Sequence, residues 1–174
     1  MESTCHYLPK EVAILLHNAL VMPLFDYCDI VYGSCGETQL SKLQRLQNFA
    51  GKVILKVPYD TPSEHVRSQL NWLSVKKRIY FHESVMMFKC LNGLSPDYLC
   101  RKFNHVNHAY TTRQITKHNI QIQKCKLSCG QRTFEYRGSS IWNKIPSDIR
   151  NSQSLNVFKT TILKHIYKDE NINC

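Results

Sequence analysis

Apolar and polar positions in the first hundred residues recur at the spacing of amphipathic helices. The clearest run, at 40–54, places apolar side chains three and four residues apart, with Lys, Arg and Gln on the other face. Similar spacing predicts a helix at 12–20, a short second helix at 24–32 and a long helix at 75–91. Pro23 is expected to kink or end the first of these helices.

Capping residues and turns mark several helix boundaries. The TPSE sequence that begins at Thr61 matches a capping box and predicts a short helix that ends at Leu70. Ser74 is the expected N-cap of the long helix, and the Asn-Gly pair at 92–93 is its expected end. The Ser-Pro-Asp sequence at 95–97 predicts one more short helix.

The pattern changes after Phe103. Residues 104–118 are polar and lack an apolar period, which predicts an extended connector. Apolar and polar residues alternate at 120–127 and again at 133–136, and this predicts a β-hairpin whose second strand stops at Gly138. Ser154 is the expected N-cap of a final amphipathic helix.

These elements predict a mainly α fold. We expect a helical bundle of about five to six helices, followed by a small basic lobe with a β-hairpin and a C-terminal helix. The expected domains are a helical domain at 1–103 and the basic lobe at 104–174. A chain of 174 residues is long enough to bury a core of this kind.

Positive charge is concentrated in the predicted basic lobe. Residues 1–100 contain ten Lys/Arg and nine Asp/Glu, whereas residues 101–174 contain thirteen and four, so residues 101–174 carry nine of the ten net positive charges. A field of one sign fits a polyanionic partner, and nucleic acid fits better than a membrane surface. The predicted nucleic-acid-binding residues are Arg101, Lys102, Arg113, Lys117, Lys124, Lys126, Arg132 and Arg137. An ordinary solvated surface is the simpler alternative.

Neither a metal site nor a catalytic site is expected from the residue types and their spacing. Asp26 and Asp29 are three residues apart, but no third acid or phosphate-binding loop accompanies them, so surface carboxylates are the better interpretation. Cys125 and Cys129 have histidines nearby at 105, 108 and 118, but no second cysteine pair completes a zinc site. The eight scattered cysteines indicate reduced thiols, and we expect no cofactor.

Targeting signals are not evident in the sequence. No stretch approaches the ~20 apolar residues of a membrane span, and the first residues lack the pattern of a signal peptide. The basic run at 76–78 begins a periodic helix, where three successive side chains point in different directions. We therefore expect an intracellular protein, nuclear or cytoplasmic, with no membrane partner.

Several segments occur in the same order as in a known family. The segments are LFDYCDIVYG, LSKLQRLQNFAGKVIL, TPSEHV, LNWLSVKKRIYF, LNGLSPDYL, GQRTFEYRGSSIWNKIP and SLNVFKTTILKHI. Together they resemble the region after the palm in reverse transcriptases of LINE-type, jockey-like retrotransposons, which lack long terminal repeats. The chain departs from that family at Tyr32, where Trp is common, and at Lys52, where Arg is usual.

The resemblance implies a thumb-like domain at 1–103 and the C-terminal segment of an RNA-directed DNA polymerase. The catalytic Ala-Asp-Asp site, its metals and the nucleotide pocket would lie upstream, so we expect no enzyme activity from this chain. The implied partners are nucleic acid, as RNA template, primer duplex or target DNA, and the missing palm domain. A structural or protein-interaction module without a nucleic-acid role is the alternative.

Overall fold

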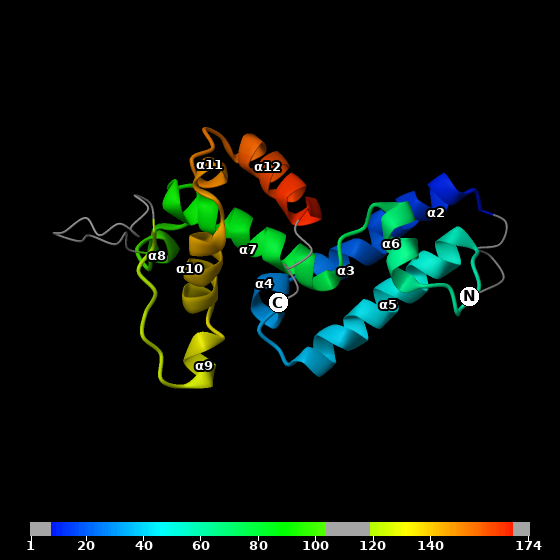
Figure 1. Cartoon of the computed structure of the whole chain (residues 1–174), viewed down its shortest axis with the longest axis horizontal. Coiled ribbons are helices and arrows are strands. Elements are labelled where there is room, and N and C mark those ends of the chain that lie inside the picture. Colours follow the sequence, from blue (N-terminus) through cyan, green and yellow to red (C-terminus); the bar gives the residue numbers. More distant parts are fainter. Residues whose placement is uncertain (1–7, 104–118, 169–174) are drawn as a thin grey trace. The chain divides into compact units, whose positions relative to one another are not determined.

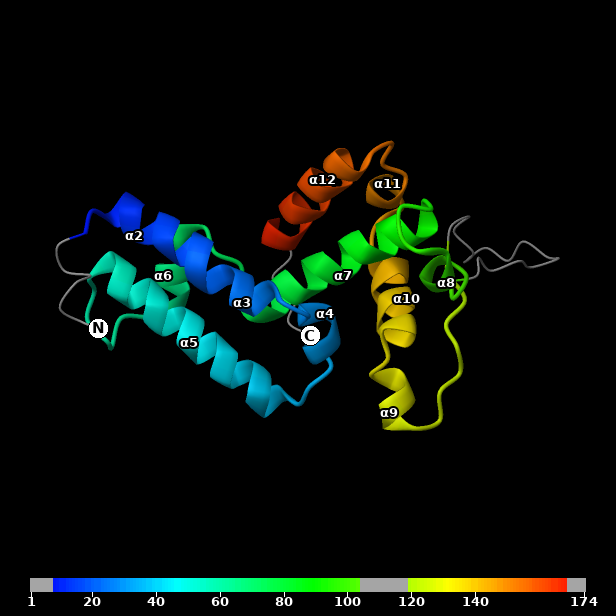
Figure 2. The same ribbon diagram turned by 180° about the vertical axis from the view of Figure 1, so that it is seen from behind.

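All regular elements in the described part of the chain are helices. The computed structural model describes residues 8–103 and 119–168 (Figure 1 and Figure 2). Its contacts divide the chain into two compact units, unit 1 at 1–78 and unit 2 at 79–174. The predicted mainly α fold is therefore confirmed. No helix among the described residues is both long and apolar enough to cross a bilayer.

The division between the units falls inside α7 (Val75–Leu91), which begins in unit 1 and continues through unit 2. The boundary predicted at 103/104 follows the change in charge along the sequence. That assignment of a thumb-like domain and a basic lobe stays a prediction. The predicted connector at 104–118 lies outside the described residues.

Unit 1 begins with three consecutive helical segments. These are α2 (Lys10–Leu16), the π-helix η1 (His17–Val21) and α3 (Met22–Asp26), and α4 (Asp29–Tyr32) follows them. Pro23 lies in the first turn of α3, where a helix needs no backbone N–H donor, so helical structure continues past it.

Close packing of α5 (Glu37–Leu55) on α6 (Ser63–Leu70) depends on a glycine. A Cβ atom at Gly51 would lie 2.7 Å from Cγ1 of Val66 and 3.3 Å from Cδ1 of Leu70. Because Val66 is fully buried and its β-branched side chain is stiff, neither helix could stay where it is with a larger residue at this position.

Two of the three predicted side-chain caps are confirmed. The Ser74 hydroxyl accepts a hydrogen bond from the amide of Lys77 at 3.3 Å, and Ser154 accepts one from Val157 at 3.3 Å. The capping box at Thr61 is wrong, because Pro62 is the N-cap of α6 and no side chain caps it. Thr61 precedes the N-cap by one residue and belongs to the preceding turn. Its amide donates a hydrogen bond to the carbonyl of Pro58 at 3.1 Å.

The buried His17 joins the N-terminal helices to the rest of unit 1. Its imidazole stacks on the indole of Trp72, with ring centroids 4.3 Å apart and planes 20° from parallel. Burial lowers the pKa of His17; the Asn18 side chain opposes this shift, and the charge of Arg78 adds to it. The folded protein therefore holds this imidazole in its neutral form at a pH where the unfolded chain is already protonated.

Unit 1 should lose stability as the pH falls below 6.5. The pKa of His17 in the folded chain lies below 6.5, the ordinary value for histidine, so the unfolded chain binds the proton first and is stabilised by it. The contribution of His17 to the free energy of unfolding should be constant above that pH and should decrease below it, by at most about 1.4 kcal/mol per pH unit for one proton. Urea unfolding between pH 7.5 and 5.5 measures this effect. His17→Phe keeps an aromatic ring and cannot titrate, so an unchanged pH profile in that variant would contradict the assignment.

In unit 2, α7 leads through a left-handed turn into a short helix. Gly93 has φ of 67°, and the amide of Leu94 donates to the carbonyl of Lys89 at 2.8 Å, which ends α7 as predicted from its Asn-Gly pair. The helix α8 (Asp97–Cys100) follows, capped by Pro96. The second described range, which begins at residue 119, contains α9 (Ser128–Gln131), α10 (Phe134–Lys144), α11 (Ser147–Arg150) and α12 (Leu155–Lys168).

The β-hairpin predicted at 120–136 is wrong. Its second strand is the first turn of α10, where the Thr133 side chain accepts a hydrogen bond from the amide of Tyr136. Alternation over four residues is too short to separate a strand from a capped helix. Gly138 does not stop the element either, because it is buried in mid-helix, and a Cβ atom there would lie 2.6 Å from Sδ of Met87.

The core of unit 2 is built around stacked aromatic rings. Phe158 of α12 is fully buried; its ring centroid lies 4.5 Å from that of Phe88 on α7 and 5.9 Å from that of Trp142 on α10. Phe103 packs edge-on against Phe134, with centroids 5.7 Å apart. These contacts hold α7, α10 and α12 together, and burial of Trp142 follows the sequence-based interpretation of that residue as core.

Candidate nucleic-acid interface

A segment without regular structure brings two of the predicted cations alongside α10. At its start, Ile120 and Asn143 exchange two hydrogen bonds of 2.9 Å, backbone amide to side-chain oxygen and side-chain amide to backbone oxygen. Nearby, the buried guanidinium of Arg150 donates to Oδ1 of Asn119 at 2.9 Å. Figure 1 shows the chain continuing from this anchor beside α10 toward α9.

The carboxylate of Glu135, in the first turn of α10, contacts two other segments of unit 2. Its Oε1 accepts a hydrogen bond from Nε2 of Gln123, and its Oε2 lies 3.7 Å from Nζ of Lys102, which follows α8. On the other side, Nε2 of Gln131 in α9 donates to the carbonyl of Cys125 at 3.4 Å. The end of α8, the segment 121–127 and α9 therefore meet around the N-terminus of α10.

Five of the predicted cations lie on these elements with exposed side chains. We call this set the basic rim: Arg101, Lys102, Lys124, Lys126 and Arg132. Arg132 immediately precedes the N-cap of α10, where the helix dipole adds a partial positive charge. The described residues of unit 2 contain four acids, Glu83, Asp97, Glu135 and Asp148, and the carboxylate of Glu135 lies 3.7 Å from the rim cation Lys102.

Arg137 differs from the rim residues because its guanidinium is engaged inside the unit. Its Nη2 atom lies 2.6 Å from Oε1 of Glu83, and the two side chains are 19% and 3% exposed. This ion pair joins α10 to α7. The guanidinium that was predicted to contact nucleic acid therefore already has a carboxylate partner inside the unit. Arg113 and Lys117, the other two predicted site residues, lie outside the described residues.

Sequence reasoning did not single out Tyr98. The side chain lies on α8, three residues before Arg101, and 71% of it is exposed. An exposed ring among cations is the kind of side chain on which an unpaired base stacks. Its place before Leu99 and Cys100 gave no signal, because a tyrosine there is equally suited to a core.

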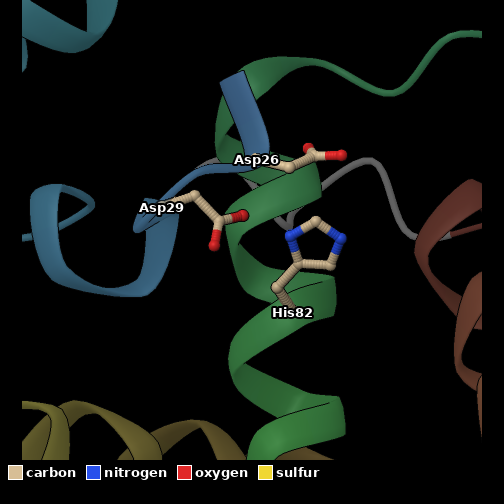
Figure 3. A group of neighbouring side chains, drawn as sticks. All are labelled: Asp26, Asp29 and His82. Atoms are coloured by element: carbon tan, nitrogen blue, oxygen red, sulfur yellow. The ribbon is translucent and has the colours of Figure 1, made fainter. Parts of the chain in front are cut away.

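The two aspartates of unit 1 are not both the surface carboxylates that the sequence suggested, because Asp26 is paired with Arg78 and Asp29 is buried. Both carboxylate oxygens of Asp26 accept hydrogen bonds from the guanidinium of Arg78, one of them at 2.6 Å. Asp29 is buried in the first turn of α4. Figure 3 draws the two aspartates with His82 of α7, which belongs to unit 2, and we assign no metal site to the three residues.

Cys125 and Cys129 lie before and within α9, in the part of the chain that also carries the rim. Neither belongs to a group of three or more ligands close enough to hold a metal within the described residues.

Comparisons with protein-family models, with curated proteins and with solved structures return no match to this chain.

Proposed function

We propose that this chain is a non-catalytic, nucleic-acid-binding C-terminal fragment of a retrotransposon RNA-directed DNA polymerase. It would bind template, primer duplex or target DNA through phosphate contacts, inside the cell, in the nucleus or the cytoplasm. The observation that carries the binding role is the basic rim, in which exposed cations from three separate elements lie around the N-terminus of α10.

The composition of the rim favours a phosphate backbone over other anions. Its cations are spread along an extended segment and two helix ends, a distribution that suits a repeating charge better than a single small anion. Tyr98 adds a surface for an unpaired base next to Arg101. The collinear segments quoted above support the retrotransposon part of the proposal, and they leave the catalytic acids to a region upstream.

The affinity for nucleic acid should fall steeply with salt. If the five rim cations each contact one phosphate, the slope of log K against log salt concentration should be about −4.5 on duplex DNA and about −3.5 on a single strand. Fluorescence anisotropy with labelled duplex DNA, single-stranded DNA and RNA, each at several salt concentrations, measures the slope. A slope near zero on all three would contradict the binding role.

A matched pair of variants tests where the contacts lie. Lys124→Gln/Lys126→Gln/Arg132→Gln should reduce the magnitude of the duplex slope to about 1.8, because only two rim contacts remain. Lys10→Gln/Lys42→Gln/Arg45→Gln removes the same charge from exposed positions of unit 1 and should leave the slope unchanged. Equal losses in the two variants would show that net charge, and not the rim, determines binding. Circular dichroism checks that both variants fold.

The second candidate function, a structural or protein-interaction module, is favoured by a different observation. Several large apolar side chains on the N-terminal helices of unit 1 are exposed. A group of neighbouring exposed apolar side chains is typical of a region that contacts a partner. A chain that associates but shows no affinity for nucleic acid at low salt would support this function over the first.

A further inference from the structure

The three N-terminal helical segments of unit 1 present apolar residues on two sides. The inner side contains the buried His17 and Met22. The outer side carries seven exposed apolar residues at helical spacing, which we call the apolar ridge: Val12, Leu15, Leu16, Ala19, Leu20, Pro23 and Leu24. Leu20 and Leu24 are 68% and 75% exposed, so the ridge is open in the folded chain.

Charge is missing from this part of the surface. The sequence has no Lys, Arg, Asp or Glu between Glu11 and Asp26, which lie at the two ends of the ridge. A solvated helix face normally carries such residues, because apolar side chains gain nothing from exposure to water. The ridge therefore has the composition of a face that is covered in the functional state.

The size of the ridge matches one side of a small, specific interface. Its residues span about 18 Å along the helical segments at 1.5 Å per residue. They expose on the order of 600 Å² of apolar surface, which is about the share of each partner in the smallest stable interfaces. The largest apolar patch on a typical monomer is about 300–600 Å² and is often functional, so the ridge lies at the upper end of that range.

A second copy of the chain fits this face. The ridge repeats every three to four residues, so two ridges can interdigitate in an antiparallel crossing about a twofold axis near its middle. In such a pair Leu16 and Leu20 of one copy lie near Leu20 and Leu16 of the other. Because the ridge is uncharged, the pairing opposes no like charges, although the whole chain carries a net charge of +10.

We propose that the apolar ridge is a homodimer interface, formed by antiparallel contact of α2, η1 and α3 with the same elements of a second copy. The inference concerns unit 1 and does not depend on the proposed nucleic-acid function. Each dimer would carry two basic rims.

Sedimentation equilibrium of the full chain between about 1 and 100 μM tests the proposal. The wild-type chain should show a reversible monomer–dimer equilibrium, and Leu16→Lys/Leu20→Lys should raise the dimer dissociation constant at least tenfold, because like charges would meet across the twofold axis. Leu46→Lys introduces a lysine at an exposed position of α5 outside the ridge, 59% exposed, and should leave the constant unchanged.

Several outcomes would overturn the proposal. A wild-type chain that stays monomeric at 100 μM, or an equal effect of Leu46→Lys, would show that the ridge is not a self-association surface. Flotation of the wild-type chain with phosphatidylcholine vesicles, lost in the Leu16→Lys/Leu20→Lys variant, would assign the ridge to a membrane surface instead. Urea unfolding of each variant confirms that the lysines change association and not folding, since Leu16 and Leu20 are both exposed.

Discussion

Replacing Phe158 with Ala should lower the free energy of unfolding of unit 2 by about 3–5 kcal/mol. The Phe158 ring is fully buried and stacks on Phe88 and Trp142, so its removal leaves a cavity where α7, α10 and α12 meet. Urea denaturation followed by far-ultraviolet circular dichroism measures the change. An effect of this size would be a large fraction of the stability of a small domain.

The adjacent residue provides the control. Val157 lies on the same helix and is 52% exposed, so Val157→Ala should change the free energy of unfolding by about 0.5 kcal/mol or less. If the two substitutions had similar effects, the aromatic cluster would not be the core of unit 2.

Replacing Arg137 with Met should destabilise unit 2 by about 3–5 kcal/mol, because it removes the cation that offsets a buried carboxylate. Glu83 is 3% exposed, and its Oε1 lies 2.6 Å from the guanidinium of Arg137. The double variant Glu83→Met/Arg137→Met should recover most of the loss, since a pair of apolar side chains can replace a buried ion pair with little cost. A double-mutant cycle in urea measures both effects.

Lys144→Met is the matched control for Arg137→Met, because it removes an exposed cation from the same helix and should have little effect on stability. The salt slope of nucleic-acid binding should also be unchanged in Glu83→Met/Arg137→Met, because the guanidinium of Arg137 is already engaged. A double variant no more stable than Arg137→Met, or a reduced salt slope, would contradict the structural role of this pair.

Helices with strong local signals were predictable from the sequence. The helices near 40–54 and 75–91 have a sustained apolar period, and Ser74 and Ser154 cap their helices as expected. Such signals involve residues within four positions of one another, so they act before any tertiary contact is made.

The hairpin failed because a nonlocal contact decided the outcome. The apolar positions 134, 141, 142 and 145 follow a helical period, but the alternation at 133–136 predicted a strand, and Gly138 was its predicted end. The reason for a glycine there is the sulfur of Met87, which lies in a different helix and leaves no space for a Cβ atom. Nothing within four residues of Gly138 reveals that neighbour.

The candidate interface also depends on both local sequence and tertiary contacts. The amino-acid sequence alone shows that residues 101–174 are strongly basic and predicts helices in the first hundred residues, because charge and local periodicity are properties of neighbouring residues. Which of these cations can contact a partner depends on tertiary packing. Packing leaves Lys124 and Arg132 on the exposed rim and brings Arg137 to Glu83, 54 positions earlier. Packing also buries one apolar side of the N-terminal helices and leaves the other exposed. The sequence pattern does not distinguish these two sides, because both are apolar.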